Sequence, residues 1–372
     1  MIDFNFGTRV ILGDGVRSGL PTQLDALAVR RPLLVTDAGL VRAGIAERVV
    51  SAFAADRRPE LFDAVPENPT EAAVEQAAVL YRERSCDGIV GLGGGSPMDL
   101  AKALAVLVGD GRPLAHRAFH VCGWNAPALP AVPPLVLMPT TAGTGSEVSR
   151  GAVLTFKDGR KSGILAQGVV RLALCDPELT HGLPARLTAA TGVDAMSHCV
   201  EAFCSPTRHP LADAIALDGL QRLAASIEAA TQDGLHARAR AEMMLGALEG
   251  GMCLQKGIGA VHALSHPLGA TGVHHGQLNA VLLPHVLAWN APALADKLPR
   301  LRHALGLGEA GDVAGYFHGL RERLGLPGRL RDLGIERSAL PAYAERSLAD
   351  SSQSNPRPMA APDYLAVLTA AW

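Results

Sequence analysis

The sequence predicts an α/β domain over residues 1–182 followed by an all-helical domain over residues 183–372. The first half alternates short apolar runs with amphipathic stretches, whereas the second half is rich in Ala and Leu and has few β-branched runs. The length of 372 residues is sufficient for two hydrophobic cores. Since strands that alternate with helices form largely parallel sheets covered on both faces, we expect such a sheet in the first domain.

Three apolar runs of the first half predict buried strands: RPLLVTD (31–37), CDGIVGLGGGS (86–96) and PPLVLMPTT (133–141). Ahead of the second of these, TEAAVEQAAVLYRERS (70–85) has the periodicity of an amphipathic helix. A further helix is predicted for PMDLAKALAVLV (97–108), which has proline in its first turn, where the missing amide hydrogen is tolerated. This alternation is typical of a parallel sheet.

The second half predicts long helices, beginning with LPARLTAATGVDAMSHCVEAF (183–203). Its helical patterns are interrupted by short breaks at SPTRHP (205–210), HPLGATGVHHG (266–276) and GLPGRLRDLG (325–334). The chain contains no internal repeat and no low-complexity tract. We therefore expect a single helical domain in this half.

Composition excludes several classes of function. Charged residues make up 19% of the chain and the net charge is −2, so no basic patch indicates a nucleic-acid partner. No run reaches the roughly 18 apolar residues that a membrane span needs, and the start MIDFNFGTRVILGDG lacks the apolar core of a signal peptide. The six cysteines are scattered without CxxC spacing, as in a protein with reduced thiols. We expect a cytoplasmic enzyme with neither nucleic-acid nor membrane partners.

Two glycine-rich segments follow predicted strands. Gly93-Gly94-Gly95-Ser96 opens a helix, and such a turn lets the backbone approach an anion at the positive end of the helix dipole. The segment PTTAGTGSE (139–147) is rich in hydroxyl groups and glycine. Either segment alone is equally compatible with a tight turn and a helix cap. Together, at the ends of successive parallel strands, they favour a bound dinucleotide in a Rossmann-like domain.

Asp37 ends the strand LLVTD and could accept hydrogen bonds from the adenosine ribose of such a dinucleotide. A carboxylate at this position would repel the 2′-phosphate of NADP. The sequence therefore favours NAD(H) over NADP(H).

One carboxylate and three imidazoles of the second half predict a metal site. Asp194 and His198 lie four residues apart and share one face of a helix, while His262 and His275 flank a glycine-rich turn. This oxygen and nitrogen set without thiolate suits Fe(II) or Zn(II), and it does not choose between them. His262 and His266 repeat the four-residue spacing. With 13 histidines in 372 residues, chance alone gives roughly half of one such His–His pair, so the spacing by itself is weak.

Seven segments in order resemble the motifs of the iron-containing (group III) alcohol dehydrogenases: GGGSPMDLAK, PTTAGTGSEV, DPELT (176–180), TGVDAMSHCVEAF, GAVHALSHPLG, HHGQLNAVLLPHV and SNPRPM. The resemblance covers nearly the whole chain. It implies a dinucleotide-binding α/β domain followed by a helical metal and substrate domain, a fold shared with dehydroquinate synthase. It also implies hydride transfer between NAD(H) and an alcohol or aldehyde, with iron as the expected metal.

The resemblance also implies roles for individual residues. The metal ligands would be Asp194, His198, His262 and His275, with His275 preferred over the adjacent His274. His266 resembles the residue considered for proton relay. The positions that match cofactor contacts, in addition to Asp37, are Asn68, Gly93, Gly94, Gly95, Ser96, Asp99, Thr140, Thr141, Thr144, Lys161 and Leu179.

The chemistry can be argued from the residues as well. Hydride transfer to an aldehyde places negative charge on its oxygen, which a Lewis-acid metal stabilises, while the nicotinamide carries the hydride. A proton must then reach the alkoxide. His266 is suitable because imidazole titrates near neutral pH.

The departures from the family pattern concern the expected substrate pocket. Cys253 stands where relatives commonly have phenylalanine, and Gly151 replaces a larger residue, which indicates a roomier pocket. Lys256 or Arg150 could meet an anionic tail such as a carboxylate or phosphonate. The alternative for Lys256 is an ordinary solvated helix residue.

Three other functions are compatible with parts of the pattern. A dehydroquinate-synthase-like lyase would need a different ligand set and several basic residues for a phosphate, which are not evident. A maleylacetate-reductase-like enzyme would transfer hydride without metal, and it is disfavoured because all four ligand positions are filled. A cofactor-binding scaffold protein would be expected to have a broken ligand set.

The segment FNFGTRVILG (4–13) contains β-branched and aromatic residues and predicts an edge strand. An exposed edge has to be covered or paired. Members of the resembling family commonly pair near this segment. We therefore expect a homodimer.

Overall fold

The computed structural model describes residues 5–123, 128–348 and 354–372. By internal contacts the chain divides into two compact units. Among the described residues, the α/β unit comprises residues 5–141 and 146–180, and the helical unit comprises residues 142–145 and 181–372. The sequence predicts a division between residues 182 and 183. The two units divide two residues earlier, after Thr180, and the short segment Ala142–Gly145 is grouped with the helices. The domain boundary between residues 182 and 183 stays a prediction.

The α/β unit is built on a six-stranded sheet of order β1-β8-β5-β4-β2-β3, in which every paired strand is parallel. This agrees with the Rossmann-like parallel sheet expected from the sequence. The strands are β1 (Arg9–Leu12), β2 (Pro32–Val35), β3 (Glu60–Phe62), β4 (Gly88–Gly93), β5 (Leu135–Pro139) and β8 (Val170–Cys175). A separate antiparallel hairpin joins β6 (Gly151–Thr155) to β7 (Lys161–Leu165).

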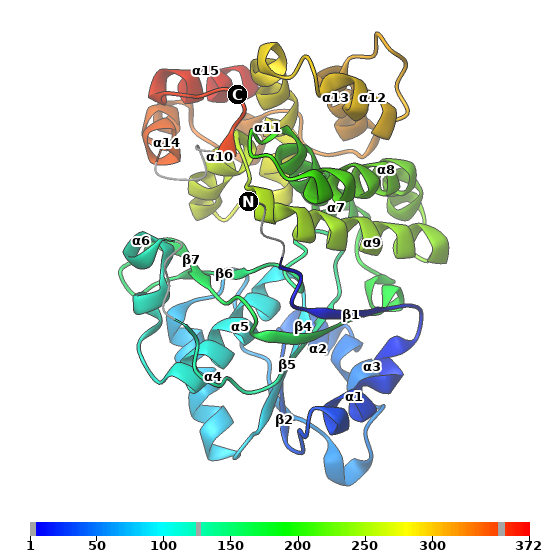
Figure 1. Cartoon of the computed structure of the whole chain (residues 1–372), viewed down its shortest axis with the longest axis vertical. Coiled ribbons are helices and arrows are strands. Elements are labelled where there is room, and N and C mark those ends of the chain that lie inside the picture. Colours follow the sequence, from blue (N-terminus) through cyan, green and yellow to red (C-terminus); the bar gives the residue numbers. More distant parts are fainter. Residues whose placement is uncertain (1–4, 124–127, 349–353) are drawn as a thin grey trace. The chain divides into compact units, whose positions relative to one another are not determined.

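Helices cover both faces of this sheet, with α4 and α5 on one side and α1 and α3 on the other (Figure 1). The strand side chains alternate accordingly: Leu33 and Ile89 pack in the core with α4 and α5, whereas Leu34 and Val90 pack in the core with α1 and α3. The helices are α1 (Leu20–Ala26), α2 (Ala38–Arg42), α3 (Ile45–Val50), α4 (Glu71–Glu83), α5 (Gly95–Asp110) and α6 (Phe119–Cys122).

The helical unit packs around one continuous apolar core. Its helices are α7 (Ala185–Cys204), α8 (Pro210–Gln232), α9 (Ala237–Cys253), α10 (Ala260–Leu268), α11 (His275–Asn290), α12 (Leu298–Ala304), α13 (Val313–Arg323), α14 (Leu340–Ser347) and α15 (Ala361–Ala371). Among the described residues, no helix combines the length and the apolar character needed to cross a membrane.

Helix α7 lies at the centre of the helical unit. Every residue from Thr188 to Cys204 is buried, and the helix packs against α8, α9 and α11. A helix that is buried on all sides normally carries apolar residues, yet α7 buries Asp194, His198 and Glu201. Because buried charged groups are costly unless they are paired, these three side chains mark a site in the middle of the core.

Candidate active site

Three of the predicted cofactor residues lie at the carboxyl edge of the sheet. Strand β4 ends at Gly93, Asp37 follows β2 by two residues, and Thr140 follows β5 directly. The pairing of β4 with both β2 and β5 brings these three strand ends together. The chain continues from β2 to β3 on one side and later to β4 on the other, so the strand order reverses at β2 and β4. In doubly wound sheets, ligands bind at this point.

The glycine turn after β4 begins at a position that has no room for a side chain. Gly93 has φ 151°, and a Cβ on it would lie 2.5 Å from Pro97 Cγ. A Cβ on Gly94 would lie 3.4 Å from Thr141 Oγ1, and the Thr140 amide donates to the Gly93 carbonyl at 3.0 Å. Helix α5 begins at Gly95 without a side-chain cap on its first turn. The arrangement leaves its N-terminal amides available to an anion.

The Asp37 carboxylate is held in place by the helix that follows it. Its Oδ1 accepts a hydrogen bond from the Leu40 amide at 3.0 Å and caps α2. A Cβ on Gly39 would lie 2.8 Å from the same oxygen, so a side chain there would displace the carboxylate. Asp37 is therefore an N-cap in the structure as well as the predicted ribose partner.

Four further predicted cofactor residues have defined places in the α/β unit. Lys161 Nζ donates to Asn68 Oδ1 at 3.0 Å, which links two predicted positions that are far apart in the sequence. The Ser96 hydroxyl donates to the carbonyl of Glu67, beside Asn68. Leu179 is 2% exposed and packs in the core on the α1 and α3 side of the sheet.

Asp99 and the neighbouring Lys102 tie α5 to the start of the β6–β7 hairpin. The Asp99 carboxylate accepts hydrogen bonds from Ser146 Oγ at 2.6 Å and from the Val153 amide at 2.9 Å. Lys102 is fully buried and donates to Ser146 Oγ at 2.8 Å, to Ser149 Oγ at 3.0 Å and to the Gly151 carbonyl at 2.7 Å. The sequence analysis missed Lys102, because a lysine on an amphipathic helix normally faces solvent.

Glu147 is a second buried charged group of this segment, with 3% of its surface exposed. Burial raises the pKa of its carboxyl to about 7, despite the attraction of Lys102. Burial in turn lowers the pKa of the Lys102 ammonium, against the attraction of Asp99 and Glu147. The residues that follow the second glycine-rich segment thus form a polar cluster within the α/β unit.

The glycines of PTTAGTGSE serve close packing within the helical unit. Gly145 has φ 58°, and a Cβ on it would lie 2.5 Å from the Cα of Gly251 in α9. A Cβ on Gly143 would lie 2.8 Å from Cβ of Thr191 in α7. Thr144 lies between these two contacts and is partly exposed. For Gly143 and Gly145, the structure therefore gives a packing reason in place of the phosphate contact inferred from the sequence.

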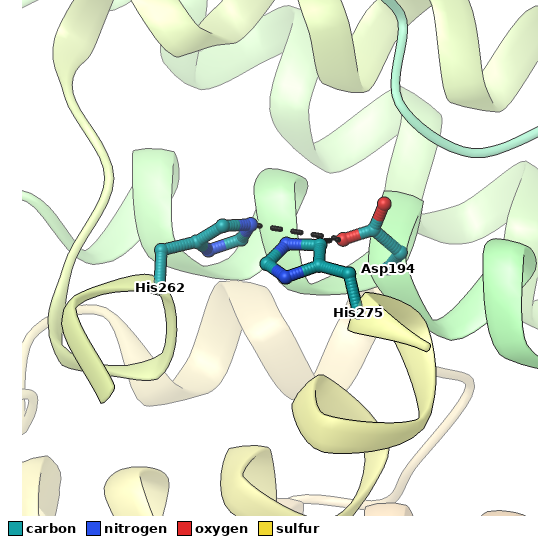
Figure 2. Close-up of side chains that lie close together, drawn as sticks. All are labelled: Asp194, His262 and His275. Atoms are coloured by element: carbon teal, nitrogen blue, oxygen red, sulfur yellow. Dashed lines mark ion pairs between the residues drawn. The ribbon is translucent and has the colours of Figure 1, made fainter. Parts of the chain in front are cut away.

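The predicted metal ligands converge from three helices of the helical unit. Asp194 Oδ1 lies 3.6 Å from His262 Nε2 and 3.6 Å from His275 Nε2 (Figure 2). His198 Nε2 lies 3.7 Å from the same oxygen. The ligand atoms of Asp194, His262 and His275 are all within 4.8 Å of one another, whereas His198 is not a member of this tightest group. The three imidazoles nevertheless surround one oxygen of the Asp194 carboxylate.

This donor set fits a divalent cation. A tetrahedral ion about 2.1 Å from each ligand holds the ligand atoms about 3.5 Å apart, close to the 3.6 and 3.7 Å separations from Asp194 Oδ1. Burial raises the pKa of the Asp194 carboxyl, but the surrounding histidines outweigh this and lower it well below its usual range. Burial lowers the pKa of His198 to about 4, so its imidazole is neutral at pH 7. An anionic oxygen beside imidazole lone pairs matches the needs of Fe(II) or Zn(II).

Two further residues contact the ligands and were missed by the sequence analysis. Glu201 accepts a hydrogen bond from His262 Nδ1 at 2.5 Å, and Asn279 donates through Nδ2 to Asp194 Oδ1 at 2.7 Å. Both are buried. Helical spacing was a usable signal: Glu201 follows Asp194 by seven residues in α7, and Asn279 follows His275 by four residues in α11.

The adjacent histidines of α11 and the histidine of α10 have distinct places. His275 is the first residue of α11 and faces Asp194, while His274 is the N-cap residue, with a buried Nδ1 that has no hydrogen-bond partner in the described part of the chain. His266 lies beside the cluster, with its ring centroid 5.5 Å from that of His275 and 5.6 Å from that of His262. It is therefore close enough to act on a molecule bound there.

Lys256 and Cys253, two of the residues predicted for the substrate pocket, are buried in the helical unit. Lys256 is 3% exposed, and its ammonium donates to Asp213 Oδ1 at 2.5 Å and to the Phe203 carbonyl at the end of α7 at 2.9 Å. It is therefore not an ordinary solvated helix residue, because its charge is paired inside the helical core. Cys253 is fully buried, and its thiol contacts the Gly250 carbonyl at 3.1 Å.

The other two predicted pocket residues lie in the α/β unit. Gly151 is the first residue of β6, and its carbonyl is held by Lys102. Arg150 precedes it, is partly exposed, and accepts a hydrogen bond from the Ala166 amide through its carbonyl at 2.9 Å. Both therefore belong to the base of the β6–β7 hairpin.

Comparison with known proteins agrees with the motifs. The family model described as iron-containing alcohol dehydrogenase matches residues 7–177, and the model of the C-terminal part of that family matches residues 188–372. The chain is 45% identical to a 4-hydroxybutyrate dehydrogenase of Cupriavidus necator, over 97% of each protein.

Solved structures extend the likeness to the whole fold. A crystal structure of 1,3-propanediol oxidoreductase superposes with a TM-score of 0.93 at 32% identity and covers 100% of both chains. A sulfoacetaldehyde reductase from Bifidobacterium kashiwanohense, solved with NAD+, has a TM-score of 0.91 at 26% identity and covers 100% of this chain and 98% of that one. The two-part fold and the resemblance stated from the sequence are thereby confirmed, and the family implies iron and NAD as cofactors. The chain belongs to the iron-containing alcohol dehydrogenase family and is an oxidoreductase of alcohols and aldehydes.

Proposed function

We propose that this protein uses NAD(H) and a divalent metal ion to interconvert an aldehyde that carries a carboxylate and the corresponding hydroxy acid. The observation that carries the metal requirement is the set of three imidazole Nε2 atoms within 3.6 to 3.7 Å of one buried carboxylate oxygen. For stability alone, apolar side chains at these positions would carry a smaller desolvation penalty than this buried polar set. The substrate class is supported by the relative at 45% identity, which is a 4-hydroxybutyrate dehydrogenase.

Asp194, His198, His262 and His275 would hold the ion. A bound divalent ion supplies Lewis acidity toward the substrate oxygen, and the nicotinamide supplies the hydride. His266, within 5.6 Å of two ligand rings, would pass the proton to or from that oxygen. We propose iron as the resident metal, with zinc as an ion that the same ligands accept.

The glycine turn Gly93–Ser96 with Thr140 and Thr141 would bind the pyrophosphate at the start of α5. Asp37 would bind the adenosine ribose and disfavour NADP(H). The remaining proposed contacts on the dinucleotide come from Asn68, Asp99, Thr144, Lys161 and Leu179. The hydrogen bond between Lys161 and Asn68 supports a shared role for these two.

For the anionic end of the substrate, we propose Arg150. We prefer it to Lys256, whose ammonium forms a buried ion pair with Asp213. Arg150 directly precedes Gly151, whose backbone is fixed by the buried Lys102, so the guanidinium projects from a rigid base. The sulfoacetaldehyde reductase among the similar structures also acts, by its name, on an aldehyde with an acidic group.

We also propose a homodimer in the cytoplasm. Strand β1 is the last strand of the sheet on one side, and Leu12 at its end is 37% exposed. An open strand edge of this kind favours pairing with a second copy. The six cysteines are all free thiols, five of them buried, which suits a reducing compartment.

The test is a substrate and metal panel. The enzyme loaded with Fe(II) or Zn(II) is assayed for NADH oxidation with 4-oxobutanoate and with butanal, which has the same chain length without the charge. We expect at least a tenfold higher kcat/KM for the acid, lost in Arg150→Ala. Equal efficiency on both aldehydes would refute the substrate class. Full turnover after complete chelation would refute the metal requirement and favour a maleylacetate-reductase-like enzyme.

A further inference from the structure

Glu201 is a buried carboxylate that contacts a proposed metal ligand without belonging to the ligand set. It lies in α7, three residues after His198, and is 5% exposed. Nothing in the chemistry of hydride transfer requires a carboxylate at this position. A buried carboxylate is retained only where its hydrogen bonds compensate for the lost hydration.

Both oxygens of Glu201 are used at the start of α10. Oε1 accepts a hydrogen bond from the Val261 amide at 2.6 Å, and Oε2 accepts one from His262 Nδ1 at 2.5 Å. When Nδ1 donates to Glu201, the neutral imidazole of His262 has its lone pair on Nε2. That atom lies 3.6 Å from Asp194 Oδ1, on the side where the other ligands converge.

The surroundings of Glu201 leave it little freedom. A Cβ on Gly259 would lie 3.0 Å from Glu201 Oε1 and 3.1 Å from Asn355 Oδ1. Asn355 Oδ1 in turn accepts a hydrogen bond from the Ala260 amide at 3.3 Å. The first two amides of α10 thus have separate acceptors, and only Glu201 also reaches the imidazole.

We propose that Glu201 is a positioning residue that fixes the ring and the tautomer of His262 and thereby sets the affinity of the metal site. The proposal rests on the proposed metal centre. A helix cap alone would require one oxygen, and Asn355 illustrates that simpler role. The second oxygen on Nδ1 is the arrangement by which a carboxylate increases the basicity of a metal-binding imidazole, and loss of such a partner typically weakens metal binding about 10- to 100-fold.

The isosteric change Glu201→Gln separates the two roles. An amide has one acceptor oxygen, so one of the two donors, Val261 N–H or His262 Nδ1–H, must face an NH2 group. If that donor is the imidazole, His262 changes tautomer and its Nε2 becomes protonated. Glu201→Ala removes both contacts and leaves a cavity. Asn355→Ala is the matched control, since it removes a cap from the same helix end without touching the ring.

The experiment measures Zn(II) binding to the full chain by chelator competition, together with the visible absorption spectrum of the Co(II)-loaded protein and the melting temperature of the metal-free protein. We expect Zn(II) affinity to fall about 10- to 100-fold in both Glu201 variants, with a changed Co(II) spectrum. Asn355→Ala should lower the melting temperature while its Zn(II) affinity stays within about threefold of wild type.

The outcomes distinguish the inference from the function on which it rests. Wild-type Zn(II) affinity in a folded Glu201→Gln or Glu201→Ala protein would overturn the role of Glu201 and leave the metal centre intact. An equal loss of affinity in Asn355→Ala would also overturn it, because stability of α10 would then explain the effect. A wild-type protein that binds no Zn(II) and no Fe(II) would refute the metal centre itself.

Discussion

The two units form their proposed binding regions by different means. In the α/β unit, the proposed cofactor edge depends largely on backbone: Gly93 excludes a side chain, α5 begins without a side-chain cap, and Thr140 is held through its amide. In the helical unit, the proposed metal centre depends on side chains that come from α7, α10 and α11 and meet inside an apolar core.

The difference has an energetic consequence. Backbone amides at the start of a helix remain close to water, so the free-energy cost of leaving them without a bound anion is small. Charged side chains inside a helical core must be compensated, as Glu201 compensates His262 and Asp213 compensates Lys256. Substitutions of single side chains should therefore lower activity or stability most in the helical unit.

The largest effect is expected for Asp194→Ala. It removes the oxygen around which the three histidines gather, and with it the negative charge that attracts a cation. We expect loss of bound metal and a fall in kcat/KM of at least about 10³-fold, since Lewis-acid stabilisation is worth several kcal/mol. Elemental analysis and NADH oxidation provide the measurement. Asp218→Ala is the matched control, because that carboxylate is 49% exposed and lies outside the cluster. An equal loss of activity in Asp218→Ala would contradict a specific role of the Asp194 cluster.

The next effect is on stability. Lys256→Met keeps the aliphatic stem and leaves the Asp213 carboxylate, which is 22% exposed, without its partner. We expect the free energy of unfolding in urea to fall by about 3 kcal/mol, the lower end for breaking a buried pair, because Asp213 can be partly hydrated. Adding Asp213→Asn should restore part of the loss. An increased KM for 4-oxobutanoate with unchanged stability would instead return Lys256 to the substrate pocket.

In the α/β unit, a buried acid gives a pH dependence. The pKa of Glu147 is about 7 in the folded state and 4.5 when unperturbed, so the folded state keeps a proton that the unfolded state releases between these values. Stability is therefore highest below pH 4.5 as far as this group is concerned, and it falls by up to about 3 kcal/mol as the pH rises to 7. Calorimetric melting at pH 5 and pH 7.5 should show a smaller decrease for Glu147→Gln than for wild type. Parallel decreases in the two proteins would contradict the burial of an uncharged Glu147.

The smallest effect concerns the cofactor. Asp37→Ser keeps an N-cap for α2 but removes the charge expected to repel a 2′-phosphate. We expect the ratio of kcat/KM with NADP(H) to that with NAD(H) to rise about tenfold, equivalent to about 1.4 kcal/mol. An unchanged ratio would show that Asp37 is only a helix cap.

Local patterns were sufficient for much of the fold. The run CDGIVGLGGGS contains β4, and TEAAVEQAAVLYRERS contains α4, because period and glycine position are properties of short segments. The hairpin of β6 and β7 was not predicted, although its Asp158-Gly159 turn, with φ 80° at the glycine, lies between alternating runs and is a usual hairpin signal.

The site was predictable only in part, for a physical reason. Asp194 and His198 share a helix face, so spacing alone brought them together, whereas the partners of Lys256, Lys102 and Glu201 lie 43, 44 and 61 residues away in sequence. Burial of a charged residue depends on such distant partners, and no local pattern contains them. This is why Lys256 was assigned to solvent or substrate, and why Glu201 was overlooked.

The most direct test of the metal centre is a crystal structure of the protein loaded with Fe(II) or Zn(II), with anomalous diffraction recorded on both sides of the absorption edge of the metal. We predict a single strong peak about 2.0–2.3 Å from Asp194 Oδ1 and from the Nε2 atoms of His198, His262 and His275. A fully active protein with no peak among these four side chains, or with a peak elsewhere, would contradict the account.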